Sequence, residues 1–275
     1  MTNILYTADF MAEQILGGGE LNDHELCKMI GQVQKIQCSK LNKGLLRDKF
    51  LIISNFITMP QEIKDHIIKH NKYVIYEHDH KYLKNRNPGV YKDFKAPNTE
   101  IINAKLYSKA LAVFCQSSFH KNIIEKNLNL DNVINLSGNL WPEETLQFME
   151  SLLELEKKDR YSIMDSFNWH KNTREAVFYC EKKGFKHELI KSSTYTEFLK
   201  MLAGNKYFIF LPKTPETLSR IVVEAKMMGV KVLTNKRVGA TYEDWYKLNS
   251  HELIEKMKNK RKEILNKVLG VYYEK

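Results

Sequence analysis

Short apolar runs alternate with helical patterns along the whole chain of 275 residues. A helix between two strands is typical of parallel sheets, because it returns the chain to the edge where the next strand begins. The alternation therefore predicts an α/β fold with parallel sheets. The predicted strands are Ile4–Ala8, Phe50–Ser54, Tyr73–Glu77, Ala110–Gln116, Val133–Leu136, Tyr161–Met164, His187–Ile190, Tyr207–Leu211 and Lys231–Thr234.

Helical periodicity fills most of the intervals between these strands. A first helix is predicted from about Asn22, with Leu26, Ile30 and Val33 on one face. Ser117 or Ser118 is predicted to cap the start of a helix. Further helices are predicted after Pro60 and over Glu143–Lys158, Thr173–Lys183, Thr196–Leu202, Leu218–Met228 and His251–Leu269.

A domain boundary is predicted near residues 138–160, because Gly138, Asn139 and Pro142 interrupt the alternation of strands and helices there. A chain of this length can bury one large core or two small ones. We expect a first domain over residues 1–140, a second over 141–250 and a C-terminal helical segment over 251–275.

One predicted strand leads directly into a helix that carries two glutamates eight positions apart, Glu216 and Glu224. With Glu216 before the helix and Glu224 two turns inside, a rise of roughly 1.5 Å per residue separates them by about 12 Å. A nucleotide sugar has a similar span between its hexose and ribose hydroxyls, and each carboxylate could accept hydrogen bonds from one pair. The N–H groups at the helix start, near Thr217, Leu218 and Ser219, would suit a diphosphate. The alternative is an amphipathic helix with two solvated glutamates.

This spacing resembles the E-x7-E motif of retaining GT-B glycosyltransferases, above all those of glycosyltransferase family four. The stretch from Glu224 to Thr234, EAKMMGVKVLT, is similar to the continuation E-A-x-x-x-G-x-P-V-I, with Lys231 in place of the proline. The resemblance implies two Rossmann-like domains whose sheets face an interdomain cleft, and a terminal helix that packs back across the junction. It also implies transfer of a hexose from a nucleoside diphosphate sugar with retention at the anomeric carbon.

Three consecutive glycines and a glutamate, Gly17 to Glu20, follow the first strand. Glycines allow the backbone to approach a phosphate closely. The segment is not the dinucleotide fingerprint G-x-G-x-x-G, but it resembles the G-G-x-E loop of GT-B enzymes. Gly18, Gly19 and Glu20 are therefore predicted to contact the donor, and a flexible turn is the alternative.

Four titratable residues, Glu77 to His80, follow the strand that begins at Tyr73. Open α/β sheets bind ligands at this end of a strand. Consecutive residues rarely converge on one ion, so no metal site is predicted. The family resemblance implies that His78 and Asp79 contact the donor sugar or orient the acceptor, while Glu77, His80 and Arg86 are placed on the acceptor side.

A third candidate segment, Ser166–Asn172, follows the first strand of the second half. The resembling family has an arginine here and a lysine five residues later, both on the donor diphosphate. Lys171 matches the lysine, whereas Ser166 stands at the arginine position. Either Lys171 and the N–H groups of the helix start hold the diphosphate, or another cation such as Lys213 or Arg220 substitutes for the arginine.

The formal net charge of +10 favours acidic partners such as nucleic acid, anionic lipid or a phosphorylated glycan. Most of the cations are lysines. An AT-rich coding sequence is by itself enough to make lysine abundant, so the charge alone does not identify the partner. Four scattered cysteines predict free thiols in a reducing cytoplasm. No run approaches the roughly 20 apolar residues that cross a bilayer, and the N-terminus is predicted to be a strand and not a signal peptide.

Together with these observations, the family resemblance implies a cytoplasmic, retaining hexosyltransferase that needs no metal or other cofactor, in the host cytoplasm if the protein is viral. Glu216 would hold the sugar, Glu224 the ribose and Lys171 the diphosphate. UDP-glucose is the predicted donor, and a glycan or protein hydroxyl, including a tyrosine of the enzyme, the predicted acceptor. A phage-type DNA glucosyltransferase and a catalytically lapsed nucleotide-sugar-binding protein stay open as alternatives, as does a homodimer.

Overall fold

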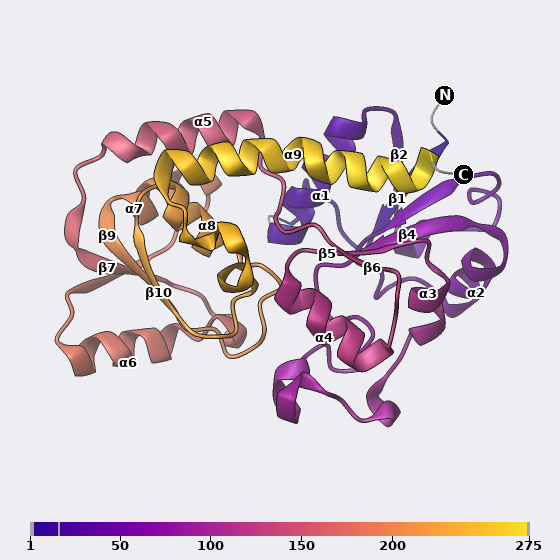
Figure 1. Cartoon of the computed structure of the whole chain (residues 1–275), viewed down its shortest axis with the longest axis horizontal. Helices are drawn as coiled ribbons and strands as arrows, with labels where there is room; N and C mark the ends of the chain where they lie inside the picture. The colour runs from indigo at the N-terminus through magenta and orange to yellow at the C-terminus, as the bar shows by residue number, and fades with distance from the viewer. Residues whose placement is uncertain (1–2, 16, 274–275) are drawn as a thin grey trace. The chain divides into compact units, whose positions relative to one another are not determined.

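The computed structural model describes residues 3–15 and 17–273, which form two compact units (Figure 1). The first unit comprises the described residues up to Leu140 together with those from Lys260 onward, and the second comprises Trp141–Asn259. Each unit contains a parallel sheet, which confirms the predicted α/β fold. No helix in the described ranges is long and apolar enough to cross a membrane.

The first unit has a six-stranded sheet in the order β2-β1-β3-β4-β5-β6, and every neighbouring pair is parallel. The chain leaves β1 to form β2 on one side and crosses back to form β3 on the other. The strands are β1 Ile4–Ala8, β2 Val33–Gln37, β3 Phe50–Ile53, β4 Lys72–Tyr76, β5 Val113–Cys115 and β6 Val133–Asn135.

Helices cover both faces of this sheet. Successive strand residues point to opposite faces, so Leu5 packs with Ile63 and Ile67 of α2, while Tyr6 packs in a second core with Leu26 of α1. The helices of this unit are α1 Gly18–Ile30, α2 Gln61–His70, α3 Ala104–Lys109, α4 Ser118–Leu128 and the C-terminal part of α9 Ser250–Tyr273. Ser117 caps α4 by accepting a hydrogen bond from the His120 N–H, as predicted.

The predicted first helix was wrong at both ends. It begins at Gly18 rather than near Asn22, and it ends at Ile30, because Gly31 has a φ of +87° that terminates it. Val33 then begins β2 instead of lying on the helix face. The sequence of this edge strand, VQKIQ, has no continuous apolar run because the strand is only partly buried.

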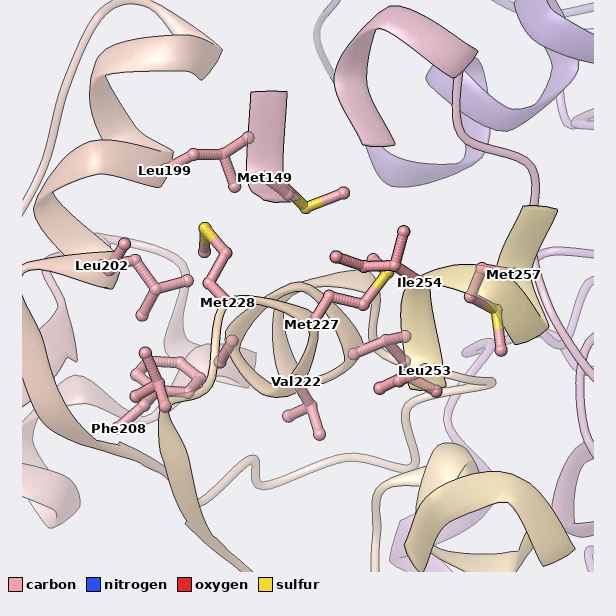
Figure 2. Packing of buried hydrophobic residues seen from close by; sticks show 14 of the residues in the cluster. Met149, Leu199, Leu202, Phe208, Val222, Met227, Met228, Leu253, Ile254 and Met257 are labelled. Carbon is pink, nitrogen blue, oxygen red and sulfur yellow. The ribbon is translucent and has the colours of Figure 1, made fainter. Parts of the chain in front are cut away.

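The second unit has a four-stranded sheet in the order β10-β9-β7-β8, again with every pair parallel. Its larger core lies on the face covered by α5, α7, α8 and the beginning of α9, where Met149, Leu199, Val222 and Ile254 meet (Figure 2). A smaller core lies beneath α6. The elements are α5 Glu143–Ser151, β7 Lys158–Met164, α6 Thr173–Lys183, β8 His187–Ile190, α7 Tyr195–Ala203, β9 Asn205–Phe210, α8 Arg220–Met227 and β10 Lys231–Thr234.

Two predicted helices of this unit are shorter in the structure. The acidic helix predicted over Glu143–Lys158 ends as α-helix at Ser151, and Lys158 already pairs in β7 with Asn205 of β9. The helix predicted from Leu218 begins at Arg220, because Ser219 has a φ of +73° and so cannot continue it.

Two glycines of the first unit provide a test of the backbone conformation at the end of α1 and a matched control for it. A Cβ at Gly31 or Gly270 would meet nothing within 4 Å, but only Gly31 has a positive φ. We expect Gly31→Ala to lower the free energy of unfolding by about 1–3 kcal/mol, the cost of a sparsely populated, positive-φ conformation for a residue with a side chain. Gly270→Ala, inside α9, should raise it by about 1 kcal/mol.

Urea-induced unfolding followed by circular dichroism would measure both changes. An unchanged midpoint for Gly31→Ala would contradict the positive φ of Gly31 at the end of α1.

Candidate functional site

The carboxyl ends of β7 and β9 are neighbours in the second sheet, although the chain forms β8 between them. Open α/β sheets bind ligands at such a topological switch point. Lys171 follows β7 and Glu216 follows β9, and the structure brings the two side chains together. Lys171 Nζ lies 2.9 Å from Glu216 Oε1 and 3.1 Å from Oε2. Their side chains are 29% and 15% exposed, so this ion pair is only partly accessible to solvent.

The loop that carries Glu216 is held by its backbone. The Glu216 N–H donates to the Arg237 carbonyl at 2.7 Å, and its own carbonyl accepts from the Gly239 N–H at 2.9 Å. The Ala240 N–H donates to the Leu218 carbonyl at 3.0 Å. These bonds form a parallel bridge beyond the ends of β9 and β10, and they fix the Glu216 side chain beside Lys171.

Glu224 has a very different environment. It is the fifth residue of α8, one turn inside the helix instead of two, and the residue is 3% exposed. Its Oε1 accepts from Trp141 Nε1 at 2.9 Å and from the Tyr195 hydroxyl at 2.6 Å, and Arg220 Nε lies 3.4 Å away. Burial, followed by the Glu224 charge, raises the pKa of Tyr195. Neither Trp141 nor Tyr195 was predicted as a partner, because no local sequence signal links them to Glu224.

The two predicted substitutes for the missing arginine, Lys213 and Arg220, lie in different surroundings. Arg220 is 8% exposed, and its guanidinium carbon lies 4.5 Å from the Trp141 ring centroid, so it belongs to the buried group around Glu224. Lys213 instead lines an open pocket of about 390 Å³ at the carboxyl end of β7. Arg174, which the sequence reasoning missed, lines it too. The complete lining is Ser166, Phe167, Asn168, Trp169, Asn172, Thr173, Arg174 and Lys213.

In the first unit the glycine segment forms the start of α1 and not a loop before it. Gly18, Gly19 and Glu20 lie in the first turn. A Cβ on Gly19 would come within 3.2 Å of the His78 ring, so the absence of a side chain at Gly19 allows the helix start to contact His78. Glu20 Oε1 accepts from the Asn55 side-chain amide at 3.0 Å.

His78 is held from both sides of its ring. Its Nε2 lies 2.6 Å from Asp23 Oδ1, and its Nδ1 contacts the Gln116 side-chain amide. The His78 and Asp23 side chains are 5% and 3% exposed. Asp23 Oδ2 also accepts from the Tyr6 hydroxyl at 2.7 Å and the Ser54 hydroxyl at 2.5 Å. Asp23 was missed because it lies 55 positions before His78 and inside a helix.

The other residues after β4 divide into two groups. Asp79 and Arg86 are accessible, with Arg86 Nη1 3.2 Å from Asp79 Oδ2. Glu77 and His80 are buried and contact protein groups: Glu77 contacts Lys81 and Tyr107, and His80 Nδ1 lies 3.0 Å from the Tyr82 hydroxyl. Burial lowers the pKa of His80 to about 4. Glu77 and His80 therefore stabilise this segment from inside and do not reach its surface.

The described residues contain no group of three or more histidine, cysteine, aspartate or glutamate side chains placed to hold a metal ion. Cys27, Cys38, Cys115 and Cys180 are buried free thiols.

No protein-family model and no curated protein sequence matches the chain. Several solved structures do match the chain. α,α-Trehalose-phosphate synthase (UDP-forming) from Burkholderia xenovorans, in complex with glucose-6-phosphate, aligns with a TM-score of 0.59 at 6% identity, over 96% of this chain and 91% of that one. A trehalose-6-phosphate synthase studied for glycosyl transfer with retention has a TM-score of 0.59 at 7% identity, over 100% and 92%.

HepE from Anabaena, in complex with UDP and glucose, has a TM-score of 0.51 at 12% identity, over 96% of this chain and 90% of that one. At such identities the likeness concerns the fold. The predicted assignment to family four and the role of the E-x7-E motif stay predictions. The two parallel sheets and their helices are those of a GT-B fold, and these structural neighbours are glycosyltransferases.

Proposed function

We propose that this protein is a glycosyltransferase that binds a nucleoside diphosphate sugar at the carboxyl edge of the second unit's sheet. The observation that carries the proposal is the Lys171–Glu216 ion pair at the switch point between β7 and β9. It combines a cation for a diphosphate with a fixed carboxylate for sugar hydroxyls. The neighbours of similar fold include proteins in complex with UDP or described as UDP-forming, so UDP-glucose is the donor we propose.

Lys171 and Lys213 would compensate the charge that develops on the departing diphosphate. The backbone from Thr217 to Ser219 and the first N–H groups of α8 would add hydrogen bonds, because the start of a helix has N–H groups without partners inside the helix. Such preorganised donors stabilise a transition state most effectively where charge develops. We propose that these groups act without a metal.

The two glutamates would have separate tasks. Glu216 would accept hydrogen bonds from hexose hydroxyls when the donor displaces Lys171 from its carboxylate. Glu224 would use Oε2 for the ribose hydroxyls, since its three protein contacts all involve Oε1.

We propose that transfer proceeds with retention. The bond between the anomeric carbon and the diphosphate oxygen breaks, the acceptor oxygen forms a bond to the same face of that carbon, and the departing phosphate oxygen takes the acceptor proton. The neighbouring trehalose-6-phosphate synthase studied for retention supports this choice.

The first unit would provide the acceptor side. His78, held by Asp23 and Gln116, would orient the acceptor through its ring. Asp79 and Arg86 would face the acceptor, a glycan or protein hydroxyl, while Glu77 and His80 position the segment from inside.

Loss of either member of the ion pair should reduce turnover. Lys171→Ala and Glu216→Gln should each lower the rate of UDP release from UDP-glucose by about a hundredfold, equivalent to about 3 kcal/mol of lost transition-state stabilisation. Lys171→Ala should also weaken UDP binding in calorimetry, whereas Glu216→Gln should not, because UDP lacks the hexose. Lys182→Ala, an exposed lysine at the end of α6, is the matched control. Unchanged turnover in both site variants would refute the assignment.

A donor panel with intact-protein mass spectrometry should identify the substrate. We expect UDP release from UDP-glucose in the presence of a chelator, and a product with the anomeric configuration of the donor by NMR. Added hexose on the protein itself would identify a self-acceptor, for which the exposed Tyr242 and Tyr273 are the tyrosines to change. A product with the inverted anomeric configuration would refute retention. Release of no nucleoside diphosphate from any UDP-, GDP- or ADP-sugar would refute the catalytic proposal.

A further inference from the structure

We propose that the pocket after β7 in the second unit binds a nucleotide unit of single-stranded nucleic acid. Two large aromatic side chains stand exposed there, Phe167 at 93% and Trp169 at 57%. Both line the 390 Å³ pocket, together with Arg174 and Lys213. The site differs from the proposed donor contacts at Glu216 and Glu224, although it shares Lys213, and its test does not depend on glycosyl transfer.

The chemistry of the lining selects an anionic, planar ligand. None of the described residues that line the pocket carries a carboxylate, which argues against a neutral sugar, whose hydroxyls are commonly held by carboxylates. Neither Arg174 nor Lys213 forms an ion pair within residues 3–15 and 17–273. Lys191 Nζ lies 4.4 Å from the Phe167 ring centroid and adds a third cation beside the aromatic side chains. Aromatic rings that stack with bases, next to cations that contact phosphates, are the combination used by single-strand-binding proteins.

The exposed rings stand on a backbone that local hydrogen bonds hold. Asn168 Oδ1 accepts from the His170 N–H at 3.0 Å, and the Lys213 N–H donates to the His170 carbonyl at 2.9 Å. Asn172 Nδ2 donates to the Leu211 carbonyl at 2.8 Å. The turn between β7 and α6 is thus fixed to the segment after β9, so little ordering of the backbone would be required on binding.

Trp169 provides a direct signal for the test, because the other two tryptophans, Trp141 and Trp245, are buried at 0% and 4% exposure. Titration of the full chain with oligo(dT) should quench the tryptophan fluorescence. Phe167→Ala should weaken binding by about tenfold, the effect of losing one stacked base. Phe178→Ala, which changes an equally apolar residue that is 58% exposed on α6, should leave the affinity unchanged. Trp169→Phe should remove the quenching but retain the binding when it is measured with a labelled oligonucleotide.

Salt dependence separates the phosphate contacts from the stacking. Arg174→Ala should reduce the slope of log affinity against log salt by about 0.7, one single-strand phosphate contact. Equal affinities of the Phe167→Ala and Phe178→Ala variants for oligo(dT), or no oligonucleotide binding at all, would overturn the proposal. Weaker UDP binding in Phe167→Ala would overturn it as well, because the pocket would then hold the base of the donor. Tight binding of dTMP alone, without a further gain from oligo(dT), would assign the pocket to a free nucleotide instead.

Discussion

Parallel pairing between strands that are not consecutive in the chain determines where the candidate site residues of this protein lie. In the second unit, β7 pairs with β9 while the chain forms β8 outside them; in the first, β1 pairs with β3 while β2 lies outside. At each switch point the connections leave the sheet toward opposite sides, so the ends of two neighbouring strands stay open to a ligand. Lys171 and Glu216 follow one such pair of strands. In the first unit, Asp9 follows β1 and accepts from the Ile57 and Thr58 N–H groups after β3.

The Lys171–Glu216 pair contributes little to stability by itself, because ion pairs near a surface are worth about 0–1 kcal/mol. The pair is important because of where it places the two charged side chains. On the proposed function, a donor would replace the lysine at Glu216 with hydroxyls and the glutamate at Lys171 with phosphate oxygens. The number of charge-assisted contacts then stays similar, and neither side chain is left buried without a partner. On the proposed function, the ion pair keeps both groups in position while the site is empty.

Elements whose burial pattern is regular could be predicted from the sequence. The structure confirms His187–Ile190, Lys231–Thr234 and Thr173–Lys183 with the predicted bounds. The predicted element bounds were wrong where tertiary contacts override the local sequence pattern. The partly buried edge strand β2 has a polar sequence, and the end of α1 at Ile30 and the start of α8 at Arg220 depend on the positive φ angles of Gly31 and Ser219. The roles of the candidate site residues stay predictions, and their partners were not predicted. The contacts of Glu224 with Trp141 and of His78 with Asp23 join positions 83 and 55 residues apart, and nothing in the local sequence indicates a contact over such a separation.

The two glutamates of the motif show why spacing alone leaves roles undetermined. In the sequence they are equivalent, yet Glu216 lies before the helix at the end of a bridge between loop segments, and Glu224 lies inside it under Trp141 and Tyr195. A buried carboxylate requires such partners, because removing a charge from water without compensation is very costly. Glu224 therefore joins α8 to α7 and to the segment before α5, and that attachment fixes the start of α8. The same residue type eight positions apart thus provides a rigid support at Glu224 and a partly exposed ion-pair partner at Glu216. A diphosphate site requires both, because a helix start can present its N–H groups accurately only if the helix itself is fixed.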